Sequence, residues 1–268
     1  MFAMAENMVR RGAVDIEQVR WLGLQQGTFG LDGHLYSRKG AGMSLLLIPL
    51  VWLGLKVPLW GPATTALMFN SLITAATAWM LFHVARRLGA GDPSALAAGL
   101  IFGLATLAWP YAKTCFSDPL SGLCLLGAFF ALLRFRDAGR VHNAAACGLA
   151  LAIAVATRYA NAALLPLFVL FGLYCLRRHQ ASVRLRGDFV PRSREWLSAG
   201  AFATPLFVTA ALLVAYNIMR YGGPLSTGYL PEESFSGHWL QGIVGLTISP
   251  GRGLLWYAPI LWLALPVT

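Results

Sequence analysis

The chain has 268 residues, of which 57% are hydrophobic and only 12% are charged. Soluble domains carry about 25% charged residues, so the composition excludes an ordinary soluble protein and indicates an integral membrane protein. The formal net charge is +10. In a membrane protein such an excess is first explained by topology, and we expect no nucleic-acid partner.

The first forty residues are polar and charged, and the pattern predicts one short amphipathic helix that ends at Gly12. Residues 41–57 follow as a mostly apolar run that contains Pro49. A full membrane span needs about 20 residues, so this run is at the short limit. From composition alone it either crosses the membrane or forms a juxtamembrane or re-entrant helix.

The rest of the chain alternates between apolar runs and short polar connections. The runs are 64–85, 94–109, 119–133, 143–157, 162–176, 196–219 and a further one that starts at 254. Within lipid such runs must be helical, because the backbone finds no other hydrogen-bond partner there. The expected fold is therefore all-α, a polytopic transmembrane helical bundle with outer loops.

The basic residues orient this bundle. Three connections hold eleven of the twenty-one Lys and Arg residues: Arg86, Arg87, Arg134, Arg136, Arg140, Arg177, Arg178, Arg184, Arg186, Arg192 and Arg194. Short loops rich in Lys and Arg remain on the cytoplasmic side. The alternating connections at 110–118, 158–161 and 220–253 are then expected on the outer side.

These outer connections gather residues that could carry chemistry. Asp118 is the candidate catalytic acid or base and, with less support, a metal ligand. The candidate phosphate-binding cations are Lys39, Arg158, Arg220 and Arg252. The candidate sugar or lipid contacts are Tyr36, Tyr111, Tyr221 and Tyr229. Cations and aromatic rings on one membrane face suit a phospholipid or a lipid-linked phosphate.

Each candidate also has a simpler explanation. Asp118 precedes Pro119 at an expected helix start, where Asp or Ser117 would be an ordinary N-cap. Arg158 could extend from a helix end toward the headgroups. Tyrosines at this depth commonly belong to the interfacial aromatic belt. From the residues alone, these explanations stay open.

Several motifs, in this order, resemble the GT-C glycosyltransferases, in particular bacterial membrane proteins of the protein O-mannosyltransferase-like and aminoarabinose transferase-like branch. The matching stretches are 4–6 with Gly12, 32–40 (DGHLYSRKG), 116–120 (FSDPL), 217–229 (NIMRYGGPLSTGY) and 249–259 (SPGRGLLWYAP). Together they extend over nearly the whole chain.

The resemblance implies four regions. Residues 1–63 would be a first outer loop with juxtamembrane helices, and 64–219 a six-helix transmembrane module. Residues 220–253 would be an outer loop, and 254–268 the start of a further transmembrane helix. The family's first span and acidic pair are not found upstream, so the chain is expected to be a piece of a longer protein, truncated at both ends.

The resemblance also implies a function, namely sugar transfer from a polyprenyl-phosphate donor at the outer face of a bacterial inner membrane. Asp118 matches the family's second acidic position, facing the periplasm, and Lys39 matches a basic position near the donor phosphate. The only cofactor considered is a divalent metal. The alternatives are a non-catalytic membrane protein that binds lipid or joins a complex and, third, a small-solute transporter, which the lack of charges at mid-helix positions disfavours.

Overall fold

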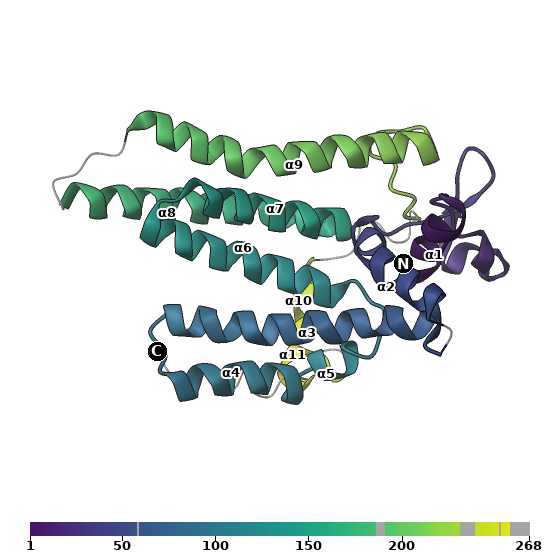
Figure 1. The fold of residues 1–268 in the computed structure, drawn as a ribbon, viewed down its shortest axis with the longest axis horizontal. Coiled ribbons are helices and arrows are strands. Elements are labelled where there is room, and N and C mark those ends of the chain that lie inside the picture. The colour runs from purple at the N-terminus through teal and green to yellow at the C-terminus, as the bar shows by residue number, and fades with distance from the viewer. Residues whose placement is uncertain (58, 186–190, 231–238, 252, 258–268) are drawn as a thin grey trace.

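The chain folds as an all-α helical bundle, which confirms the predicted fold class (Figure 1). The computed structural model describes residues 1–57, 59–185, 191–230, 239–251 and 253–257. Six helices form the body of the bundle: α3 (Gly61–Arg87), α4 (Asp92–Ala105), α6 (Asp118–Ala138), α7 (Val141–Thr157), α8 (Leu165–Leu185) and α9 (Arg192–Tyr221). They correspond one for one to the apolar runs between residues 64 and 219.

Among the described residues, four segments are long and apolar enough to cross a membrane: Gly61–Arg87, Asp118–Ala138, Tyr159–Leu185 and Ser193–Tyr221. Shorter apolar helices occupy Gly42–Lys56, Asp92–Ala105 and Val141–Thr157. The protein is therefore an integral membrane protein. Helix α4 ends earlier than the run 94–109 predicts, because Thr106 adopts an extended backbone with φ −124° and ψ 179°. The short helix α5 (Ala108–Tyr111) follows this break.

Successive helices reverse direction, so the connections alternate between two ends of the bundle (Figure 1). We call the end formed by residues 106–117, 158–164 and 222–230 the Asp118 end. The opposite end, where α3 meets α4 and α6 meets α7, is the arginine end. Up to residue 230, the predicted outer connections thus share one end, and the described parts of the arginine-rich connections lie at the other.

The N-terminal region lies at the Asp118 end (Figure 1, right). It contains α1 (Phe2–Arg11), the 3-10 helix η1 (Glu17–Gln25), strands β1 (Gly27–Phe29) and β2 (Leu35–Ser37), and helix α2 (Gly42–Lys56). Helix α1 ends as expected at Gly12, which has φ 67°. The two strands pair antiparallel, with Thr28 opposite Tyr36.

Helix α2 does not run the length of the bundle. At its start, Gly42 packs against the last turn of α7 at Ala156 and Thr157. At its end, Gly54 packs against the first turn of α3 at Gly61 and Thr65. Both ends of α2 therefore meet the same end of the bundle, which is the arrangement expected of a juxtamembrane helix.

The core is denser on one side of the bundle than on the other. In the most apolar stretch of α6, 44% of the residues are buried. The buried fraction is only 6% in the corresponding stretches of Tyr159–Leu185 and of Ser193–Tyr221. Close packing of α7 on α9 occurs where Gly148 meets the backbone of Phe202. Helices α8 and α9 therefore present most of their apolar surface to the surroundings.

The C-terminal part contains α10 (Trp239–Thr247) and the four-residue helix α11 (Leu254–Tyr257). Helix α10 falls inside the stretch expected to be an outer loop. The further span expected from residue 254 lies, after Tyr257, outside the described residues.

Candidate functional site

Asp118 is the first residue of α6, at the Asp118 end of the bundle. Ser117 occupies the N-cap position, and no side-chain capping hydrogen bond is present. Pro119 follows in the first turn. Proline lacks a backbone N–H, but an N–H in the first turn would have no partner inside the helix, so nothing is lost. The carboxylate is thus held at a helix start without being used as a cap.

The partner of Asp118 is Arg158. Arg158 is the C-cap residue of α7, and its guanidinium donates to Oδ1 of Asp118 in an ion pair. The two side chains are 47% (Asp118) and 32% (Arg158) exposed. The pair therefore combines opposite charges at a position that a ligand can reach.

An apolar groove of about 540 Å³ lies beside Asp118. It lies between α3, α4, α5 and α6, and Asp118 and Tyr111 line it together with Thr77, Phe102 and Leu126. Thr77 satisfies its hydroxyl within its own helix by donating to the Ile73 carbonyl over 2.8 Å. The groove is therefore mainly apolar and extends to the middle of α3, with one carboxylate and one phenol among its lining groups.

Two asparagines fix the loops around the groove. The Nδ2 atom of Asn70 on α3 donates to the carbonyls of Thr114 and Phe116, both at 2.8 Å. The Nδ2 atom of Asn161 donates to Oγ of Ser121 over 3.0 Å and to the Ala154 carbonyl over 2.8 Å. Asn70 sets the loop before Asp118, and Asn161 joins the turn after Arg158 to α6.

Asn70 was not among the sequence-predicted residues. A fully buried asparagine inside an apolar run is the signal that could have identified it, because a buried amide must find partners.

Lys39 lies at the same end of the bundle and is exposed. The next residue, Gly40, packs directly on the carbonyl of Ala156, so the backbone of Lys39 runs beside the end of α7, two residues from Arg158. The structure thus brings three predicted residues, Asp118, Arg158 and Lys39, to one region.

Arg220 occupies a different environment. It is 2% exposed, and its guanidinium donates to the Ser37 carbonyl over 2.7 Å and to Oδ1 of Asn217 over 2.9 Å. The same group lies 3.6 Å from the ring centre of Tyr216 and 4.7 Å from that of Tyr221. Arg220 therefore connects α9 to the N-terminal region and does not line the groove of Asp118.

The tyrosine candidates divide in the same way. Tyr111 lines the groove. Tyr36 and Tyr221 instead lie beside Arg220 and contact each other edge to face, with their ring centres 6.4 Å apart. The Tyr36 hydroxyl donates to Oδ2 of Asp32 over 2.6 Å. Burial, and then this hydrogen bond to a carboxylate, raise the pKa of Tyr36 to about 12. Tyr229 is 40% exposed and follows Gly228, whose carbonyl accepts from Thr28.

A metal site is not assembled around Asp118 in the described part of the chain. No group of three His, Cys, Asp or Glu side chains occurs there in an arrangement that could hold an ion. Asp118 contributes a single carboxylate, and Arg158 already neutralises it. These residues do not fit a divalent metal, and the mechanism below uses none. Arg252 lies outside the described residues.

Comparison with known proteins gives no assignment. No protein-family model matches this chain, and no curated protein matches it significantly. The function must therefore be argued from the site itself.

Proposed function

We propose that the protein is a membrane glycosyltransferase that takes a sugar from a polyprenyl-phosphate donor. The observation that carries this proposal is that Asp118, which forms an ion pair with Arg158, lines an apolar groove of about 540 Å³. A lipid-phosphate donor has the complementary form, with a charged group joined to a long apolar tail. The groove would hold the part of the tail next to the phosphate.

The proposed reaction assigns one role to each charged side chain. The acceptor hydroxyl oxygen forms a bond to the anomeric carbon of the sugar, and the bond from that carbon to the phosphate oxygen breaks. The polyprenyl phosphate leaves with the bonding electrons, and the hydroxyl proton passes to the Asp118 carboxylate. Arg158 and Lys39 stabilise the negative charge on the leaving phosphate.

The donor phosphate would also change the partner of Arg158. In the structure, Oδ1 of Asp118 accepts a hydrogen bond from Arg158. A phosphate that accepts the hydrogen bonds of Arg158 in its place would leave this carboxylate oxygen free to accept the acceptor hydroxyl. Donor binding would thereby make the base available.

The proposed orientation places the Asp118 end on the periplasmic side of a bacterial inner membrane. Support comes from the arginines of the opposite end, because short loops rich in Lys and Arg remain cytoplasmic. The N-terminal region and Asp118 would then face the periplasm.

The alternative that the geometry also favours is a lipid-binding protein without catalysis. The described residues offer one carboxylate at the groove, and that carboxylate is paired. A protein of this kind would retain lipid phosphates at Arg158 without transferring a sugar.

The test is transfer of a radiolabelled sugar from a polyprenyl-phosphate donor by the full-length protein, compared with Asp118→Asn. General-base catalysis contributes about 10²–10⁴-fold, so we expect a loss of that size in kcat with little change in donor binding. Asp92→Asn is the matched control, because Asp92 is also an ion-paired carboxylate in the first turn of a helix but lies at the arginine end. Equal turnover by wild type and Asp118→Asn would refute the catalytic role. Donor binding without transfer by the wild type would favour the alternative.

A further inference from the structure

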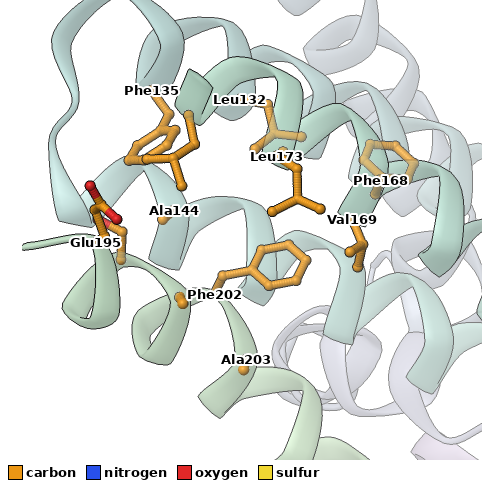
Figure 2. A pocket seen from close by; sticks show the side chains of 13 residues that line it. Leu132, Phe135, Ala144, Phe168, Val169, Leu173, Glu195, Phe202 and Ala203 are labelled. Atoms are coloured by element: carbon orange, nitrogen blue, oxygen red, sulfur yellow. The ribbon is translucent and has the colours of Figure 1, made fainter. Parts of the chain in front are cut away.

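A second apolar region lies on the other side of α6 from the Asp118 groove. One cavity of about 300 Å³ is formed by α6, α8 and α9, with Phe135, Leu173 and Phe202 among its lining residues. Figure 2 shows the Phe202 ring directed toward Leu173 and Val169 of the facing helix. A neighbouring cavity of about 440 Å³ shares Phe202 and Ala203 with the first and continues along α9 toward Thr209. We call the two together the α8/α9 cleft.

The cleft has polar groups at one extremity. Glu195 lines the cavity at the end away from Phe168 (Figure 2). Its Oε1 atom accepts a hydrogen bond of 2.6 Å from Nε2 of Gln180 on α8. Gln180 is neutral, so this contact satisfies one oxygen of Glu195 without balancing its charge, and no ion pair to Glu195 occurs among the described residues.

Two arginines lie one helical turn beyond lining residues of the cleft, toward the arginine end of the bundle. Arg177 comes four residues after Leu173, and Arg194 comes four residues before Ser198. Both are exposed, and neither forms an ion pair with a carboxylate in the described part of the chain. This end of the cleft therefore carries Glu195 and two arginines.

We propose that the α8/α9 cleft binds a phospholipid with a primary ammonium headgroup, such as phosphatidylethanolamine. The ammonium donates to Glu195, the phosphate accepts from Arg177 and Arg194, and one acyl chain extends past Phe202. The volume of the cleft favours this occupant over a protein helix, because a packed helix is about 10 Å wide with its side chains. The lining carboxylate favours it over an anionic lipid, because a headgroup without an ammonium offers no positive group to Glu195.

The proposal does not depend on the proposed glycosyltransferase function. It uses no residue of the Asp118 groove, and it concerns the arginine end of the bundle. A protein that fails to transfer sugar would still be expected to retain this lipid.

The test is lipid retention by the purified full-length chain, measured by native mass spectrometry. The protein is reconstituted with phosphatidylethanolamine, phosphatidylcholine or phosphatidylglycerol of identical acyl chains. We expect about fivefold greater retention of phosphatidylethanolamine than of the other two, the scale of one charged contact of about 1 kcal/mol near a membrane surface. Equal retention of the three lipids, or preference for phosphatidylglycerol, would overturn the proposal.

Variants separate the headgroup contact from the cavity. Glu195→Gln preserves the size of the side chain and removes its charge, so the preference for phosphatidylethanolamine should disappear while total lipid retention persists. Ala199→Phe places a ring in the cavity and should reduce retention of all three lipids. Ala215→Phe is the matched control, because Ala215 is exposed on the same helix outside both cavities.

Thermal unfolding of each variant shows whether it is folded. Retention by Ala199→Phe equal to that of Ala215→Phe would contradict the cavity assignment. An unchanged lipid preference in Glu195→Gln would contradict the headgroup assignment, even if the cavity variant failed to fold.

Discussion

Arg158 and Arg220 lie at the same end of the bundle and have opposite environments. Arg220 is 2% exposed, with its donors committed to the Ser37 carbonyl and the Asn217 side chain. Arg158 is 32% exposed, and its partner is a carboxylate that is itself 47% exposed. Residue type and topology are alike in the two cases. What distinguishes an arginine that can exchange its partner for a ligand is access to solvent, both for the arginine and for its partner.

The largest expected effect separates the two arginines by stability. Arg220→Ala should lower the free energy of unfolding by about 3–5 kcal/mol, because the Ser37 carbonyl loses its Arg220 donor, Oδ1 of Asn217 keeps only the Tyr159 hydroxyl, and a cavity forms. Arg158→Ala should cost less than about 1 kcal/mol, as is usual for exposed ion pairs. Thermal unfolding in detergent measures both, and similar losses for the two variants would show that the distinction is wrong.

Gly40→Ala tests the contact that brings Lys39 to the end of α7. A Cβ atom at this position would overlap the Ala156 carbonyl oxygen, so the backbone must shift at a cost of about 1–3 kcal/mol. Gly200→Ala is the control on α9, outside the Asp118 groove, because a Cβ there meets no atom within 4 Å. We expect a lower unfolding temperature and weaker donor binding in Gly40→Ala alone. Wild-type behaviour of Gly40→Ala would show that the packing is not required.

A double-mutant cycle between Asp118→Asn and Arg158→Gln measures how strongly the pair is coupled. Exposed ion pairs give coupling energies of about 0.2–1 kcal/mol, and we expect a value in this range that falls with added salt. Such weak coupling is what allows a phosphate to replace Asp118 as the partner of Arg158. A coupling energy of 3 kcal/mol or more would mean that the pair is a fixed structural element.

The smallest expected effect is a pH dependence confined to the N-terminal region. A hydrogen bond from the Leu35 N–H, 2.7 Å from Oε1, is the main cause that lowers the pKa of Glu17. The Tyr36 hydroxyl is the main cause that lowers the pKa of Asp32. Folding therefore favours the charged carboxylates, and the stability they add is present at neutral pH.

That stability is lost as the pH falls below the ordinary carboxyl pKa values of about 4. Hydrogen exchange of residues 27–37 should show reduced protection at pH 3.5 relative to pH 6, after correction for intrinsic rates. Glu17→Gln should lower protection at pH 6 and reduce the difference between the two conditions. A pH dependence unaltered by this substitution would rule out Glu17 as its source.

The features that follow from local sequence were predictable. Apolar runs predicted the six helices of the body, and Gly12 marked the end of α1, because hydropathy and glycine conformation act over a few residues. The alternation of spans was sufficient to place Asp118 and Arg158 at the same end. Because each of these two residues lies in a short connection between helices, few other relative positions of Asp118 and Arg158 were open.

The surroundings of Arg220 were not predictable in this way. Its contact with Ser37 joins residues 183 positions apart, and an arginine at a helix end can equally extend into the headgroups. The extended backbone at Thr106 was also missed. Its hydroxyl donates to the Phe102 carbonyl over 2.6 Å and accepts from the Ala108 N–H over 3.1 Å, which ends α4 inside an apolar stretch.

Helix α2 gives the molecule a different cross-section at its two ends. It lies across the Asp118 end, and Leu45, Leu46 and Trp52 are each more than 40% exposed on it. A helix that inserts such side chains into one leaflet displaces headgroups there and not in the other. We therefore expect the folded protein to be wider in one leaflet than in the other. Membrane curvature and the lateral pressure of that leaflet would then act on its stability.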